Sequence, residues 1–129
     1  MTLLLDTHAF YWCVRRGADI PSHVIEALHQ APRRLVSDIS AFEVAFKVRL
    51  GKFPGAAGLR DRWAEALTQL PAIALPITTA HALRGGTLDW DHRDPFDRLL
   101  AAQALTEGLT LVTADAAFAS VPGLSILRW

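Results

Sequence analysis

Short, mostly apolar runs are the strongest constraint on how this chain can fold. They cover residues 2–5, 35–37, 72–75, 109–113 and 124–127. A strand that is covered on one face alternates apolar and polar residues, whereas a parallel strand covered on both faces is apolar throughout. Because helical patterns separate the runs, the sequence predicts an α/β fold with a central parallel sheet of four or five strands flanked by helices.

Apolar residues at helical spacing fill the segments between these runs. Helices are predicted from Thr7 onward, over 21–30 with Asp19 or Ser22 as cap, from Ser40 to Leu50, over 59–69, from Thr78 or Thr79 to Arg84 before Gly85-Gly86, over 95–107, and briefly over 115–118. Asp94 followed by Pro95 is typical of an N-cap with proline at the first helical position. The start of the helix over 95–107 is therefore the best defined.

Length and charge limit what the chain can be. Its 129 residues predict one domain spanning 1–129. Thirteen Lys and Arg balance thirteen Asp and Glu, so any contact with nucleic acid must be local rather than carried by a strong overall field. Cys13 is the single cysteine, which excludes an internal disulfide, and no apolar run is long enough for a signal sequence or membrane span. We therefore expect a cytoplasmic protein.

Four acids stand in apolar surroundings on separate segments. Asp6 and Asp115 each follow an apolar run, where the ligand crevice of an open parallel sheet lies. Glu43 interrupts an apolar helix, and Asp97 falls in the first turn of another. Each has a simpler explanation as well: Asp6 and Asp115 as helix caps, Asp97 as a partner of the helix dipole, Glu43 as a salt bridge to Lys47.

Convergence of these acids at one sheet edge favours a shared site over four separate explanations. Clustered carboxylates repel one another, and a hard cation with oxygen ligands relieves that repulsion. Few histidines lie near the acids and no cysteine cluster exists, so Mg²⁺, with Mn²⁺ as a substitute, is favoured over Zn²⁺.

Four segments, taken in order, resemble the PIN domain, and specifically the VapC-like toxin ribonucleases of type II toxin-antitoxin pairs. They are residues 3–8, ending in Asp-Thr-His; residues 40–47, Ser-Ala-Phe-Glu-Val-Ala-Phe-Lys; residues 92–104, containing Asp-Pro-Phe-Asp-Arg; and residues 111–115, Leu-Val-Thr-Ala-Asp. By this resemblance the acidic quartet of the family falls on Asp6, Glu43, Asp97 and Asp115, as catalytic residues and metal ligands. Thr113 and Asp94 match supporting positions.

The resemblance also implies a Rossmann-like, three-layer PIN fold, Mg²⁺-dependent endoribonuclease activity, a small antitoxin partner and a homodimer. We expect phosphate contacts from five basic residues: Lys47, Arg49, Lys52, Arg93 and Arg98. Three consecutive aromatics, residues 10–12, cannot all face inward on a helix, so we expect Trp12 to anchor the dimer or the antitoxin. The alternative function is a catalytically inactive PIN-like module that binds RNA or protein. An acidic receiver-like domain is disfavoured because no adjacent acid pair follows an early strand.

Overall fold

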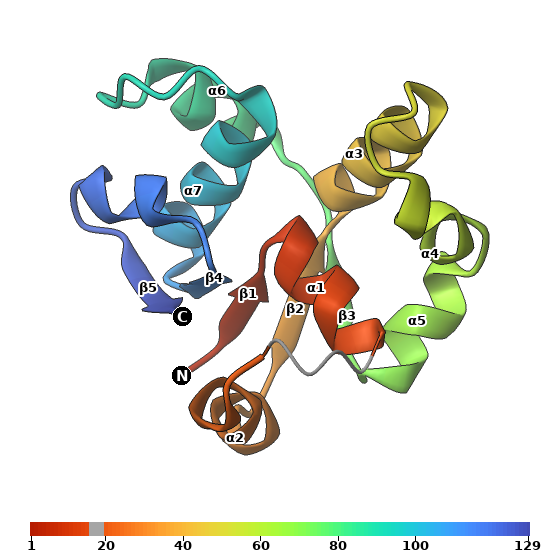
Figure 1. The fold of residues 1–129 in the computed structure, drawn as a ribbon. Coiled ribbons are helices and arrows are strands. Elements are labelled where there is room, and N and C mark those ends of the chain that lie inside the picture. Colours follow the sequence, from red (N-terminus) through yellow and green to blue (C-terminus); the bar gives the residue numbers. More distant parts are fainter. Residues whose placement is uncertain (16–19) are drawn as a thin grey trace.

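The computed structural model describes residues 1–15 and 20–129, and within them five strands form one parallel sheet (Figure 1). The strands are β1 (Leu3–Leu5), β2 (Arg34–Ser37), β3 (Ile73–Leu75), β4 (Thr110–Thr113) and β5 (Ser125–Arg128), in the spatial order β3-β2-β1-β4-β5. Every neighbouring pair is parallel. The predicted α/β class and its parallel sheet are confirmed.

Helices connect the strands. They are α1 (Thr7–Val14), α2 (Ser22–Gln30), α3 (Asp38–Arg49), α4 (Ala57–Asp61), α5 (Trp63–Gln69), α6 (Thr79–Thr87) and α7 (Pro95–Glu107), with 3-10 turns η1 (Pro54–Ala56) and η2 (Ala116–Ser120). None of the helices in the described ranges is long and apolar enough to cross a membrane.

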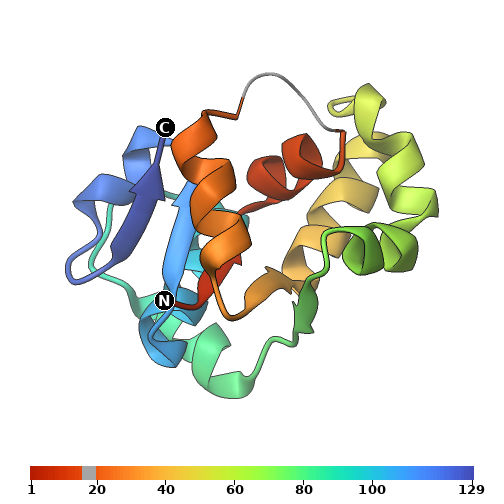
Figure 2. The same cartoon turned by 90° about the horizontal axis from the view of Figure 1, so that it is seen from below.

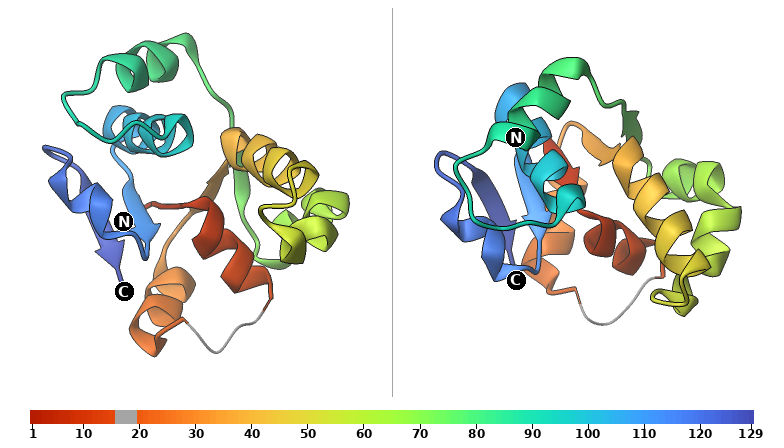
Figure 3. Two further views of the ribbon diagram at one scale, coloured as in Figure 1. Left: turned by 45° about the horizontal axis from the view of Figure 1, so that its top comes forward. Right: turned by 90° about the horizontal axis from the view of Figure 1, so that it is seen from above.

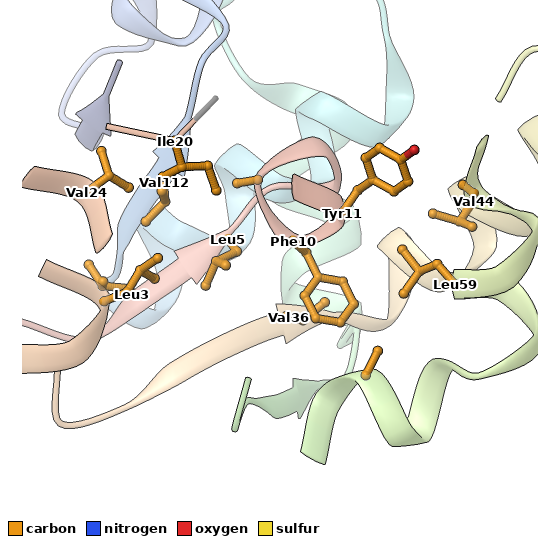
Figure 4. Close-up of a cluster of buried hydrophobic side chains, with 14 residues drawn as sticks. Leu3, Leu5, Phe10, Tyr11, Ile20, Val24, Val36, Val44, Leu59 and Val112 are labelled. Carbon is orange, nitrogen blue, oxygen red and sulfur yellow. The ribbon is translucent and has the colours of Figure 1, made fainter. Parts of the chain in front are cut away.

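Two apolar clusters sandwich the sheet because successive side chains of a strand point to opposite faces. Leu3 and Leu5 of β1 join the first cluster with Phe10 of α1 and Val24 of α2, as Figure 4 shows. Leu4 joins the second cluster, which contains α7 and η2 residues, Leu100 and Phe118 among them. Figures 2 and 3 show the resulting layers, with α1 and α2 on one side of the sheet and α6 and α7 on the other. Both faces of the central strands β1, β2 and β4 are covered, as continuously apolar strands require, whereas the edge strands β3 and β5 are more exposed.

The chain changes direction beside β1. It moves outward from β1 through β2 to β3, then returns to the other side of β1 to form β4 and β5. Strands β1 and β4 are therefore neighbours, with Leu5 opposite Val112. At such a reversal the chain leaves the carboxyl ends of the two neighbouring strands towards opposite sides of the sheet. This opens a crevice between those two ends.

The starts of two helices differ from the prediction. Helix α3 starts at Asp38, because the Ser37 side chain accepts a hydrogen bond from the Ile39 amide and acts as N-cap; Ser40 is buried inside the helix instead. Helix α2 has Pro21 as N-cap with no side-chain hydrogen bond, so Ser22 is not its cap. The alternative cap, Asp19, lies outside the described residues.

Two other helices differ in extent from the prediction. The segment 59–69 is not one helix: the backbone at Arg62 (φ −123°, ψ 35°) separates α4 from α5. Helix α6 continues through Gly85 and Gly86 to Thr87. Gly85 packs against α7, where an added Cβ would lie 3.3 Å from the Arg98 carbonyl oxygen. This contact explains a glycine inside a helix that the sequence alone marked as a stop.

Candidate active site

Asp6 and Asp115 lie at the carboxyl ends of the two strands that flank the reversal. The Asp6 amide donates to the Val112 carbonyl oxygen across the strand pair (3.0 Å). Each acid also caps a helix: one Asp6 oxygen accepts from the Ala9 amide (2.8 Å), and one Asp115 oxygen accepts from the Ala117 amide (2.9 Å). The capping explanation is therefore correct for both residues, but each cap occupies only one carboxylate oxygen.

Helices α7 and α3 supply the other two acids. Asp94 caps α7, and its Oδ1 accepts from the Phe96 and Asp97 amides, which confirms the predicted cap with Pro95 at the first helical position. Asp97 follows in the first turn and is partly buried. Glu43 is buried in the middle of α3.

One hollow of about 400 Å³ brings the four acids together. Its lining is Asp6, Thr7, His8, Trp12, Glu43, Lys47, Asp94, Asp97, Leu100, Ala114 and Asp115. A larger hollow of about 590 Å³ lies against α4 and α5, but there the acids Asp61 and Glu65 are mixed with Arg15 and Arg62. Only the smaller of these two concentrates charge of one sign.

Asp6 is held in an environment that disfavours its charge. Burial raises the pKa of Asp6 from 3.8 to about 6, and the negative charges of Glu43 and Asp115 add to the rise. Hydrogen bonds from the Thr113 side chain and the Ala9 amide act in the opposite direction. The Thr113 oxygen also accepts from the Asp115 amide (3.0 Å), so Thr113 links the two acids. The supporting role expected of Thr113 stays a prediction, and this hydrogen bond is the contact through which Thr113 would act.

Asp97 is perturbed in the same direction. Burial raises the pKa of Asp97 from 3.8 to about 6, with the charges of Asp94 and Glu43 contributing. A hydrogen bond from His92, and its charge when protonated, lower that pKa. The His92 Nε2 lies 2.7 Å from Asp97 Oδ2.

Glu43, in contrast, has partners for both carboxylate oxygens. The Thr7 hydroxyl donates to Oε1 (2.6 Å), and Lys47, one helical turn later, forms an ion pair with Oε2. The Ser40 hydroxyl lies 2.9 Å from the Thr7 hydroxyl. The Lys47 salt bridge considered from the sequence is therefore present, and it lies beside the hollow rather than replacing it.

These donors suit a divalent cation. Five carboxylates line one hollow, those of the quartet and of Asp94, and Lys47 is the single Lys or Arg among its lining residues. Carboxylate oxygens are the ligands that Mg²⁺ prefers, and Mg²⁺ usually keeps several waters. Within the described ranges, the one group of three residues whose ligand atoms all lie within 4.8 Å is His92, Asp94 and Asp97. The quartet thus surrounds a space wide enough for water rather than forming a closed cage.

The five basic residues predicted to contact phosphate are placed very differently. Lys47 lines the hollow, with its ammonium 5.6 Å from the Phe96 ring centre. Arg49, Lys52 and Arg93 are exposed outside that lining. Arg98 is used by the fold: its guanidinium donates to four carbonyl oxygens, those of Gly85, Leu88, Trp90 and His92. These four hydrogen bonds give Arg98 a structural role, and the phosphate contact expected from it stays a prediction.

Three residues near the acids were not predicted as site residues. Thr7 fixes Glu43, His92 bonds to Asp97, and Trp12 lines the hollow. Thr7 and His92 adjoin motif acids in sequence, which is a usable signal. The sequence gives no such signal for Trp12. It indicates only that three consecutive aromatics cannot all be buried on a helix, and in the structure Phe10 and Tyr11 are the buried ones.

Comparison with known proteins places this geometry in context. The family model described as "PIN domain" matches residues 3–124. No curated protein matches the chain. Among solved structures, VapBC2 from Rickettsia felis bound to a promoter DNA fragment is 16% identical, with a TM-score of 0.71 over 100% of this chain and 99% of that one.

Two further structures resemble the fold at similarly low identity. VapBC-1 from nontypeable Haemophilus influenzae is 22% identical, with a TM-score of 0.68 over 100% of this chain and 98% of that one. VapC20 from Mycobacterium tuberculosis, described as a sarcin-ricin loop cleaving toxin, is 16% identical, with a TM-score of 0.59 over 93% and 95%. At such identities these likenesses concern the fold.

Proposed function

The chain belongs to the PIN domain family, and on that premise we propose that it is a metal-dependent endoribonuclease. Asp6, Glu43, Asp97 and Asp115 are the proposed metal-binding and catalytic residues. The observation that carries the proposal is the hollow in which these four acids meet, at the point where the sheet reverses direction. A purely structural role leaves unexplained why two of them are buried where their ionisation is disfavoured.

In this proposal the chain supplies carboxylate oxygens around an open space and holds them in fixed positions. Asp6, Asp97 and Asp115 bind the ion directly or through water. Asp97 and Asp115 each retain an oxygen beyond the hydrogen bond to the protein, whereas Asp6 accepts from both the Ala9 amide and the Thr113 side chain. Glu43, held by Thr7 and Lys47, positions the ion or orients the water. Lys47 gives the phosphate a cation at the rim of the hollow. A bound Mg²⁺ or Mn²⁺ would lower the pKa of that water and neutralise charge on the leaving oxygen.

The direct test is RNA cleavage by the purified protein. We expect cleavage in Mg²⁺ or Mn²⁺ and its loss in EDTA, with identically purified Asp97→Asn as control for contaminating nucleases. Mapping new 5′ ends in cellular RNA after induction would identify the substrate. Tight RNA binding with no metal-dependent cleavage would contradict the proposal and favour the inactive binding module.

We further propose that the protein is the toxin of a toxin-antitoxin pair and is inhibited by a small cognate antitoxin. The support is the fold it shares with several solved toxins of such pairs. A short reading frame beside this gene, encoding a small DNA-binding protein, is the expected source. Co-expression of that protein should abolish RNA cleavage, and an equimolar complex that still cleaves RNA would contradict the assignment.

The proposed homodimer has a candidate interface on α3. Phe42, Phe46 and Leu50 occur at every fourth position and are 58%, 43% and 46% exposed. The two phenylalanine rings stack at 5.7 Å, and Phe96 of α7 lies 5.9 Å from Phe42. A two-fold dimer packs one patch against its own copy, which suits a continuous apolar stripe. Trp12, the anchor predicted from the sequence, is half-buried.

Two matched variants would assign the interface. We expect Phe42→Ser to shift the dimer towards monomer in sedimentation at micromolar concentration, because it removes the centre of the stripe. Trp12→Ala should leave the dimer mass unchanged if the stripe is the interface. A dimer that dissociates with Trp12→Ala but not with Phe42→Ser would restore the interface predicted from the sequence.

A further inference from the structure

His92 contacts the proposed active site from outside the acidic quartet. It lies in the segment between α6 and α7, and its Nε2 is 2.7 Å from Asp97 Oδ2. An ionised carboxylate only accepts hydrogen bonds, so Nε2 must carry the hydrogen. Among the described residues, His92 supplies the one side-chain hydrogen bond to the Asp97 carboxylate.

The imidazole ring of His92 is itself held by an aromatic neighbour. Its ring stacks on Trp90, with centres 4.6 Å apart and planes at 28°. Trp90 in turn donates from Nε1 to the Ser120 hydroxyl (3.1 Å) and packs against buried Phe118.

The backbone of the same segment is fixed as well. Arg98 donates to the carbonyl oxygens of Leu88, Trp90 and His92. A histidine needed only to fill surface would not require a stacked indole and a tethered backbone behind it. The arrangement therefore aims one N–H at one carboxylate oxygen.

We infer that His92 is a positioning residue that fixes the orientation of Asp97 and leaves the second oxygen, Oδ1, for a divalent cation. This inference rests on the proposed function, because it assigns Asp97 to the metal. Residues that orient metal ligands typically change metal affinity about 10- to 100-fold when removed. His92 would act in this way without touching the ion.

Two variants separate the hydrogen bond from the ring. His92→Phe keeps a flat ring to stack on Trp90 but removes the N–H, whereas His92→Gln removes the ring and retains an N–H donor. His23→Gln, on the exposed surface of α2, serves as control. The readout is Mn²⁺ and Mg²⁺ binding by isothermal titration calorimetry at one fixed pH, with thermal melts in EDTA to verify folding.

We expect His92→Phe to weaken the binding of both ions about 10-fold, and His92→Gln to retain affinity close to that of the wild type and of His23→Gln. Unchanged affinity in a folded His92→Phe variant would overturn the inference. A wild type that binds neither ion would instead overturn the proposed function, so the two failures are distinguishable.

A direct metal contact by His92 predicts a different pattern. Imidazole favours Ni²⁺ over Mg²⁺, whereas a positioning residue affects both through the same carboxylate. We expect His92→Phe to lower Ni²⁺ and Mg²⁺ affinity by similar factors. A loss confined to Ni²⁺, or an equal loss in His92→Gln and His92→Phe, would overturn the positioning role in favour of direct ligation.

Discussion

The surroundings of Arg98 and the acidic hollow bury charge in opposite ways. Arg98 is partly buried, and its guanidinium finds four carbonyl oxygens that gather the end of α6 and the segment before α7. In the hollow, Asp6 is almost fully buried and Asp97 partly so, and the nearest charges include other carboxylates. Around Arg98 the fold surrounds a positive charge with acceptors, while in the hollow it gathers negative charges that disfavour one another's ionisation.

The contact between α6 and α7 shows the satisfied pattern a second time. Buried His81 accepts from the Thr78 amide at Nδ1, so its Nε2 carries a hydrogen and donates to Glu107 (2.8 Å). Gln103 donates to the Pro76 carbonyl oxygen, although its own Oε1 is the one buried side-chain atom without a partner among the described residues. Buried polar groups that serve the fold are matched with partners, because each unmatched group costs about 1 to 3 kcal/mol. Acids gathered where burial and their mutual repulsion disfavour ionisation therefore indicate a site for a cation from outside.

Replacing one of these mutually repelling carboxylates should affect chemistry far more than stability. We expect Asp97→Asn to lower RNA cleavage by at least roughly 100-fold, because it removes a charge that holds the metal. The folded protein should be equally or more stable in EDTA, since repulsion among the acids is relieved. Cleavage assays and denaturant unfolding measure the two effects. Wild-type cleavage by this variant would leave Asp97 as a partner of the helix dipole only.

Replacing Arg98, whose guanidinium is surrounded by carbonyl acceptors, should lower stability. Arg98→Lys keeps the charge but loses the planar fork, so several carbonyl oxygens lose their donor. We expect a loss of about 3 kcal/mol in the free energy of unfolding. Arg93→Lys, at an exposed site in the same segment, should change it by less than about 0.5 kcal/mol. Equal stability of the two variants would show that the four hydrogen bonds contribute little.

The pH dependence of stability should separate the regions further. Because the pKa of Asp6 is raised from 3.8 to about 6, the folded protein binds this proton more tightly than the unfolded chain does. The contribution of Asp6 to stability is therefore greatest below about pH 4 and falls by about 2 kcal/mol as pH rises to about 6.

A variant isolates that contribution from other titrating groups. In EDTA, Asp6→Asn should gain stability relative to wild type between pH 4 and pH 6, and asparagine still caps α1. Adding Mg²⁺ at pH 7 should stabilise the wild type and leave the variant nearly unchanged. Parallel stability curves across this range would contradict the raised pKa.

The smallest effect on stability is expected at the exposed edge of the contact between α6 and α7. The Glu107 side chain is 43% exposed, whereas its partner His81 is 1% exposed. Glu107→Gln retains an acceptor for the His81 N–H, and exposed charge pairs contribute at most about 1 kcal/mol. We expect a change below that value in denaturant unfolding. A larger loss would mean that the fold relies on the Glu107 charge itself.

Local signals made much of this structure predictable. The five strands follow from apolar runs, and the start of α7 follows from Asp94-Pro95, because both patterns depend on neighbouring residues. Asp6 and Asp115 could be brought together from sequence because parallel strands end at a common edge. The PIN resemblance then indicated Glu43 and Asp97 as their partners.

Features set by distant contacts were not predictable. The continuation of α6 through Gly85 depends on the approach of α7, and the role of Arg98 depends on a loop folding over it. Nothing local distinguishes a guanidinium that binds phosphate from one that binds carbonyl oxygens. The position of His92 beside the motif acids is a sequence signal, but its hydrogen bond to Asp97 depends on the loop that Arg98 and Trp90 hold.

The reversal of the chain beside β1 has a consequence for synthesis on the ribosome. Strand β1 is made first, yet its neighbour β4, and Asp115 beyond it, come near the end of the sequence. A nascent chain that stops before β4 has Asp6, Glu43 and Asp97 but lacks one wall of the hollow. The proposed site would therefore stay incomplete until β4 and Asp115 have been synthesised, and a product truncated before β4 would lack that wall.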